Sequence, residues 1–275
     1  MSTPRALVTG ASRGIGSEMA ILLAQQGYSL VLVGREAATL NAIVDSLQPA
    51  GSPHEVLVAD LSTASGLAAT AGRVRAGDIT LVVSNAGIPA YGPFAALEPS
   101  ALDAAWRLNT SATLVLTHTA LPAMQAAHSG GLIIMSSALA FAGSLSNLPL
   151  SGRVQPPLPH RALYAASKAA LLAFVRALSY DLGADGVRMT VTCPGIVATD
   201  WNGGVGLKAP TAMAPRDVAL ATWRAYQLGD LICVPGLENQ EVLENFKNEE
   251  TLLFRAAQSS AVGSRYLEAR TRTVN

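Results

Sequence analysis

The sequence predicts an α/β fold in which helices cover both faces of a mostly parallel sheet. Hydrophobic runs typical of strands alternate with helical patterns along the chain, as in a parallel sheet covered by helices. The first strand runs directly into a glycine-rich turn that opens a helix. A chain of 275 residues with 50% hydrophobic content can bury one large core. We therefore expect a single domain over residues 1–275, with a less regular segment at 200–275.

The elements are expected to end at glycine and proline. Gly27 ends the first helix, Pro49 and Gly51 follow the second, and Gly183 and Gly186 precede the sixth strand. The expected strands are residues 6–8, 29–33, 55–59, 79–83, 132–135, 187–192 and 231–234. The expected helices are residues 17–26, 37–47, 102–127, 163–182, 215–228 and 241–254, and residues 264–275 are either a helix or a frayed tail.

Composition excludes several classes of protein. The formal net charge is zero, so there is no electrostatic case for binding nucleic acid or an acidic membrane. No uninterrupted apolar run has the length of a transmembrane helix, and the first strand begins too soon after Met1 for a signal peptide. Cys193 and Cys233 do not form a disulfide framework. We expect a reduced, cytoplasmic protein.

The turn after the first strand has the glycine spacing Gly-xxx-Gly-x-Gly. Gly10 permits a backbone conformation that a side chain forbids, and Gly14 lets a phosphate approach the main chain. Gly16 lets the following helix pack close to its strand. N–H groups at the start of that helix then face the anion. An ordinary strand-to-helix turn is the alternative, but the pattern favours a dinucleotide site.

The end of the second strand predicts which dinucleotide is bound. Arg35 stands where NAD-binding folds usually place an acid, and a guanidinium suits a phosphate. Arg13 could reach the same phosphate, so we predict NADP(H) over NAD(H). Glu36 is interpreted as an acid of the first helical turn. Asp60 either caps the next helix or meets the adenine, and the sequence leaves both roles open.

Tyr164 and Lys168 are four residues apart, so they share one face of their helix. A free tyrosine has a pKa near about 10 and is a poor acid or base at neutral pH. A nearby ammonium favours the phenolate and lowers that pKa. The pair is thus a candidate acid–base group, although Tyr-xxx-Lys alone is common in helices. Asn109 is a poor helix former inside an expected helix, which indicates a role other than supporting it.

Taken together, these motifs resemble the short-chain dehydrogenase/reductase family, in its single-domain branch. The matching residues run from position 9 to position 199 and comprise TGASRGIG, Asp60, Asn85-Ala-Gly, Asn109, Ser137, YAASK and PGIVAT. The resemblance implies a Rossmann-type sheet of seven strands in the order 3-2-1-4-5-6-7, and a tetrad of tyrosine, lysine, serine and asparagine.

The resemblance also assigns roles to individual residues. Tyr164 would be the proton donor in reduction, with Lys168 lowering its pKa and holding the nicotinamide ribose. Ser137, rather than Ser136, would bond the substrate oxygen, and Asn109 would help position a water beside Lys168. The implied cofactor-binding residues are Gly10, Ser12, Arg13, Gly14, Ile15, Gly16, Arg35, Asp60, Leu61, Asn85, Ala86, Gly87, Tyr164, Lys168, Pro194, Gly195, Val197 and Thr199.

The spacing from Ser137 to Tyr164 departs from the family by roughly a dozen residues. A proline-rich stretch at 141–160 supplies the excess, and we expect it to shape the substrate pocket. His160 and Arg161 are expected to face solvent. The other pocket walls are expected from residues 91–97 and 201–214, and the ligand is expected to be hydrophobic because Phe94, Leu145, Leu148 and Trp201 line them.

The resulting prediction is an NADPH-dependent reductase of a ketone or aldehyde, reversible as an alcohol dehydrogenase. An epimerase or dehydratase with the same cofactor site is one alternative. A non-catalytic NADP-sensing protein is another, although it would have no need of both Tyr164 and Lys168. A small-molecule carbonyl or alcohol is the expected partner, and the family resemblance implies a homodimer or homotetramer.

Overall fold

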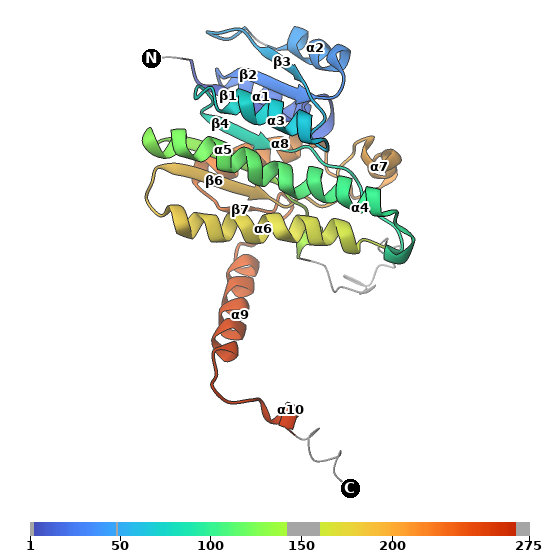
Figure 1. Ribbon diagram of the computed structural model, residues 1–275, viewed down its shortest axis with the longest axis vertical. Helices are drawn as coiled ribbons and strands as arrows, with labels where there is room; N and C mark the ends of the chain where they lie inside the picture. Colours follow the sequence, from blue (N-terminus) through green and yellow to red (C-terminus); the bar gives the residue numbers. More distant parts are fainter. Residues whose placement is uncertain (1–2, 48, 142–159, 268–275) are drawn as a thin grey trace. The chain divides into compact units, whose positions relative to one another are not determined.

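The computed structural model describes residues 3–47, 49–141 and 160–267, which form two compact units, Met1–Pro235 and Gly236–Asn275. The first unit contains one sheet of seven parallel strands in the order β3-β2-β1-β4-β5-β6-β7 (Figure 1). This is the predicted class and order of strands. The strands are β1 Arg5–Thr9, β2 Ser29–Gly34, β3 Glu55–Val58, β4 Leu81–Ser84, β5 Gly130–Met135, β6 Val187–Thr192 and β7 Ile232–Cys233.

Helices cover both faces of this sheet. On one face α1 (Gly14–Gln25) packs along α8 (Pro215–Leu228), and on the other α3 (Ala64–Val74) packs along α5 (Ala112–Ala126), as Figure 1 shows. The remaining helices of the first unit are α2 Ala37–Ser46, α4 Pro99–Trp106, α6 Ala162–Leu182 and the short α7 Trp201–Gly204. The central strands are near-continuous apolar runs because both of their faces are buried.

The topology places the loops of interest at one edge of the sheet. The strand order reverses between β1 and β4, since β1 is followed in the chain by β2 on its other side. Ligands of open α/β sheets bind outside the carboxyl ends of the strands at this switch point. The turn after β1 and the segments after β4, β5 and β6 all begin at carboxyl ends of strands.

The expected helix at 102–127 is wrong in detail. It is divided into α4, a π-helical turn at Arg107–Ser111 and α5. Asn109 lies in the π-helical turn and is 1% exposed. A π-helical turn adds one residue to a helical turn and is often found at functional sites. The low helix propensity of Asn109 was therefore a real signal of irregular backbone.

Helix α6 is the one described helix whose length and composition would allow it to cross a membrane. The helix is not an uninterrupted apolar run, because Lys168, Arg176 and Asp181 lie within it, so the sequence expectation stands beside this finding. Helices buried in the core of a protein can have the same length and apolar composition, and α6 packs against β6 and carries the buried Lys168. The sequence predicts that His54, in the turn before β3, is solvated; instead its Nδ1 accepts a hydrogen bond from the Leu30 main-chain N–H at 3.2 Å.

The second unit contains α9 (Glu241–Ala257) and α10 (Ser264–Leu267). Helix α9 extends three residues beyond the predicted end at Phe254. Its first turn carries Glu241 and Glu244 and its last turn carries Arg255, an arrangement that complements the helix dipole. Residues 268–275 lie outside the described residues.

Candidate active site

The glycine turn after β1 forms a floor that side chains could not occupy. Gly10 and Gly14 have φ values of +63° and +59°, in the left-handed region that favours glycine. A Cβ on Gly16 would lie 2.1 Å from the Gly10 carbonyl oxygen, so α1 packs against the turn at the closest possible distance. Helix α1 begins at Gly14, and its first turn contains no acidic side chain to compete for its N–H groups.

Asn85 ties this turn to the end of β4. Its Nδ2 donates to the carbonyl oxygens of Thr9 and Gly10 at 3.0 and 3.2 Å. The Thr9 hydroxyl in turn accepts from the main-chain N–H groups of Asn85 and Ala86 at 2.9 and 3.0 Å. Asn85 therefore fixes the glycine turn against the end of β4, and Gly87, two residues later, lies near Lys168 of α6.

The segment after β6 provides the facing wall. Thr199 lies against the glycine turn, because a Cβ on Gly14 would be 3.1 Å from its Cγ2 atom. Pro194 is buried and its carbonyl accepts from Ala138 N–H at 2.8 Å, while Gly195 is exposed. Val197 forms an isolated parallel bridge with Met213. Two segments far apart in the sequence thus meet at the start of α1.

Two exposed arginines, Arg13 and Arg35, follow the neighbouring strands β1 and β2. Arg13 is paired with Asp200, the Nη1 to Oδ2 distance being 2.5 Å, and both side chains are more than half exposed. Arg35 is close enough to Asp60 for its charge to lower the Asp60 pKa, although hydrogen bonds from Ser62 are the larger cause. Each arginine thus has a different carboxylate nearby, and Arg13 is paired with its own.

Asp60 does not cap the next helix. Its Oδ1 accepts from the Ser62 N–H and hydroxyl at 2.9 and 2.6 Å, while Thr63 is the N-cap of α3 and accepts from Gly66 N–H. Thr63 immediately precedes the helix, and this position decides which side chain reaches the free N–H groups. Glu36 similarly stands at the N-cap of α2, one residue before the first turn in which it was expected. The remaining cofactor-binding residues implied by the family resemblance are the half-buried Ser12 and Ile15 and the buried Leu61.

The π-helical turn aims Asn109 at the loop after β4. Its Oδ1 accepts from the Ile88 N–H at 2.9 Å, and its Nδ2 donates to the Ile88 carbonyl at 3.0 Å. The same Nδ2 lies 3.4 Å from the Ser167 hydroxyl on α6. A Cβ on Gly87 would be 3.2 Å from Asn109 Oδ1 and 3.6 Å from Lys168 Nζ, so both groups border the backbone of Gly87.

Ser137 and Tyr164 meet beside this point. A side-chain hydrogen bond from Ser137 lowers the pKa of Tyr164, but burial has the larger effect and raises that pKa above its usual value. Tyr164 is 7% exposed. Ser137 also accepts from Leu139 N–H at 3.1 Å, whereas the Ser136 hydroxyl donates to the Lys168 carbonyl and braces α6. The geometry distinguishes the two serines by what each hydroxyl contacts.

Lys168 is buried at 4% exposure, and its Nζ donates to the Met135 carbonyl at 2.9 Å. Burial lowers the pKa of Lys168 to about 8. Its Nζ lies 5.8 Å from the centroid of the Tyr164 ring. Burial raises the pKa of Tyr164, and Lys168 makes no resolved contribution to it, so the expected lowering of the Tyr164 pKa by Lys168 is not seen among the described groups.

Two aromatic side chains that the sequence placed only in candidate pocket walls lie directly against Tyr164. The ring centroids of Tyr91 and Trp201 are 5.1 and 5.4 Å from that of Tyr164. Arg161 is corrected: it is partly buried and lies near Tyr91, where burial raises the Tyr91 pKa to about 12 and the Arg161 charge opposes that rise in part. His160 is exposed as expected. The proline-rich stretch, with Leu145 and Leu148, lies outside the described residues.

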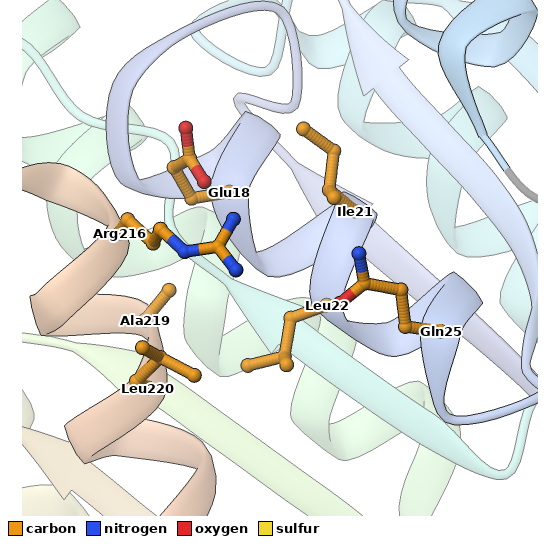
Figure 2. A pocket seen from close by; sticks show the side chains of 7 residues that line it. All are labelled: Glu18, Ile21, Leu22, Gln25, Arg216, Ala219 and Leu220. Carbon is orange, nitrogen blue, oxygen red and sulfur yellow. The ribbon is translucent and has the colours of Figure 1, made fainter.

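A shallow groove on the helical face is separate from this site. It lies between α1 and α8, and Figure 2 shows Glu18 and Arg216 projecting toward each other at its mouth. Its floor is apolar, formed by Leu22, Ala219 and Leu220. None of its lining residues belongs to the tetrad or the glycine turn, so the groove has no part in the chemistry considered below.

A doubly wound sheet that brings a glycine turn, a buried Tyr–Lys pair and a serine to the carboxyl ends of its strands defines an oxidoreductase. Comparison with known proteins agrees. The short chain dehydrogenase family matches residues 4–209, and the chain belongs to this family.

The relatives are oxidoreductases as well. An uncharacterized oxidoreductase of Myxococcus xanthus is 31% identical over 84% of this chain and 86% of its own length. A hydroxynaphthalene reductase of Aspergillus fumigatus is 29% identical over 79% of this chain and 77% of its own length. The solved short-chain dehydrogenase of Sphingobium yanoikuyae in complex with NADPH is 25% identical, covers 96% of this chain and all of its own, and superposes with a TM-score of 0.86.

Proposed function

We propose that this protein is an NADPH-dependent reductase that converts a ketone or aldehyde to an alcohol, and that the reaction is reversible. The observation that carries the proposal is the meeting of four side chains at one place. Ser137 bonds Tyr164, and Lys168 and Asn109 both border Gly87 beside them. Tyr164 and Lys168 share α6, Asn109 comes from the π-helical turn and Ser137 follows β5, so their convergence is a product of the fold.

The residues around the glycine turn suit a nicotinamide dinucleotide. The turn packs so tightly that side chains are excluded from it, and the start of α1 has N–H groups to offer to a diphosphate. The bound cofactor would supply the hydride. The residues proposed to hold it are Gly10, Ser12, Arg13, Gly14, Ile15, Gly16, Arg35, Asp60, Leu61, Asn85, Ala86, Gly87, Tyr164, Lys168, Pro194, Gly195, Val197 and Thr199.

NADP(H) is proposed over NAD(H) because Arg13 lies in the turn after β1 and Arg35 follows the neighbouring strand β2, and a guanidinium suits a phosphate. The Sphingobium yanoikuyae relative that was solved with NADPH supports the same choice. Arg35→Ala should weaken NADPH binding by at least about tenfold, the loss of a charge-assisted phosphate contact, and leave NADH binding nearly unchanged. Equal losses for the two nucleotides would contradict this assignment.

The side chains divide the remaining work. Tyr164 donates its hydroxyl proton to the substrate oxygen in reduction and takes it back in oxidation. Ser137 holds that oxygen and stabilises its developing charge. Lys168 supplies positive charge beside the phenolate that forms, and Asn109 keeps the Gly87–Ile88 backbone in place and helps to position a water beside Lys168.

Replacement of Tyr164 by Phe tests the mechanism. NADPH oxidation with a panel of carbonyl compounds should fall at least about a hundredfold, because the acid is lost, whereas NADPH binding measured by fluorescence should persist. Tyr180→Phe is the matched control, because Tyr180 lies on the same helix and is 88% exposed. Retained turnover in Tyr164→Phe would refute the mechanism. Stoichiometric consumption of added NADPH separates reduction from an epimerase or dehydratase reaction.

We also propose that the protein is a homodimer or homotetramer. Leu114 and Val115 on α5 are 36% and 39% exposed, and adjacent exposed apolar side chains on a long helix suit a contact with a second copy. Light scattering after gel filtration measures the mass directly. A monomer at micromolar concentration would remove this part of the proposal.

A further inference from the structure

The proposed acid Tyr164 is surrounded by aromatic carbon on one side. Tyr91 meets it edge to face with an interplanar angle of 63°, and Trp201 meets it at 51°. Tyr91 and Trp201 also contact each other, with ring centroids 6.0 Å apart at 86°. Tyr164 is buried, whereas Tyr91 and Trp201 are only half-buried. The accessible surface next to the phenol is therefore contributed in part by two aromatic rings.

The indole is held in a fixed orientation. Trp201 Nε1–H donates to the Gly87 carbonyl at 3.2 Å, which satisfies its only polar group. Gly87 is also the residue that Asn109 and Lys168 border. Trp201 thus connects the segment after β6 to the loop after β4, and beyond that one bond the ring offers only carbon and the face of its π-system.

We propose that Tyr91 and Trp201 select substrates in which an aromatic ring is attached to the carbonyl carbon. This inference rests on the proposed reductase function. A carbonyl oxygen that reaches the Tyr164 hydroxyl places its substituents within a few ångströms of that phenol, where the two rings lie. Aromatic substituents gain edge-to-face or offset contacts with such rings beyond the burial of area alone. A saturated ring of the same size gains the area and lacks the electrostatic part.

The test compares acetophenone with cyclohexyl methyl ketone, which differ only in the aromaticity of one six-membered ring. Wild-type enzyme should prefer acetophenone in kcat/KM after correction for the intrinsic reducibility of each ketone, measured with borohydride. Trp201→Leu and Tyr91→Leu should each lower the acetophenone to cyclohexyl ketone ratio by about two- to tenfold, the factor that one aromatic pair contributes. A general loss of folded enzyme lowers both rates and leaves the ratio unchanged.

Three further variants separate the ring from its surroundings. Trp201→Phe keeps an aromatic face and loses the bond to Gly87, so it should retain most of the preference. Tyr91→Phe keeps the ring and should retain it as well. Trp106→Leu removes a tryptophan that is 42% exposed on α4 and should leave the ratio unchanged.

The outcomes are distinguishable. Equal corrected rates for the two ketones in the wild type, or unchanged ratios in both leucine variants, overturn the inference and leave the reductase function standing. Absence of NADPH oxidation with either ketone and with the wider carbonyl panel overturns the proposed function and this inference together.

Discussion

Replacement of Asn109 by Ala should destabilise the protein substantially, in addition to any effect on turnover. The side chain is 1% exposed and satisfies both main-chain groups of Ile88 through one acceptor and one donor atom. Alanine leaves that N–H and that carbonyl without the partners they now have. A buried polar group that loses its partner costs about 1–3 kcal/mol, so the two together lower the free energy of unfolding by about 2–4 kcal/mol at this partly buried position.

The assay is urea unfolding followed by fluorescence, with the midpoint and slope measured for both proteins. An unchanged slope with a lower midpoint identifies loss of stability in the folded state. The corresponding fall in melting temperature is about 5–15 °C for a domain of this size. Thr119→Ala is the control, because its hydroxyl donates to Val115 O on the exposed side of α5, and its free energy of unfolding should change by less than about 0.5 kcal/mol.

Asn109→Asp sharpens the test. Aspartate keeps an acceptor for the Ile88 N–H but sets a second acceptor against the Ile88 carbonyl, so it should recover only part of the loss. If Asn109→Ala unfolds within about 0.5 kcal/mol of the wild type, the reasoning that the π-helical turn is held by this side chain is refuted.

Three other perturbations follow from the charges. Burial lowers the pKa of Lys168 to about 8 from an ordinary 10.5, so between pH 8 and 10.5 unfolding takes up a proton. The free energy of unfolding of the wild type, measured by urea titration, should therefore rise relative to that of Lys168→Met as pH increases from 8 to 10.5, by up to about 1.4 kcal/mol per pH unit. The Arg73 guanidinium lowers the pKa values of Glu55 and Asp78, so these ion pairs stabilise the fold at neutral pH and stop doing so as pH falls through the lowered pKa values. In Arg73→Ala the free energy of unfolding should therefore fall less steeply at acid pH than in the wild type. An unchanged pH dependence would count against these ion pairs. Asp200→Asn frees the Arg13 guanidinium and should tighten NADPH binding roughly two- to fivefold at low salt, with the gain shrinking at high salt in fluorescence titrations.

The fold could be predicted almost completely from the sequence because its strands are buried on both faces. Runs such as residues 30–33 are apolar at every position and end at glycine, which leaves little ambiguity about period or boundary. The glycine turn was equally clear, since the left-handed φ values of Gly10 and Gly14 are a demand that few other residues meet.

The failures have a common origin in contacts between distant residues. The bond between Arg13 and Asp200 joins positions 187 apart, and nothing local to either residue indicates it. The π-helical turn at Asn109 depends on Ile88 in another loop. The Tyr164 pKa was predicted from one nearby charge, whereas burial of the side chain raises it. Local patterns report backbone preference, but side-chain partners across the sheet are decided by packing.

The glycines and the arginines of the proposed nucleotide site differ in how freely they can be substituted. A methyl group on Gly16 or Gly10 meets main-chain atoms at 2.1 and 2.9 Å, so these positions tolerate almost no drift. Arg13 and Arg35 are exposed and can be exchanged with little structural disturbance. Under the proposed function, descendants of this sequence would change their nucleotide preference through the two arginines and inherit the turn unaltered, and protein engineers can follow the same route.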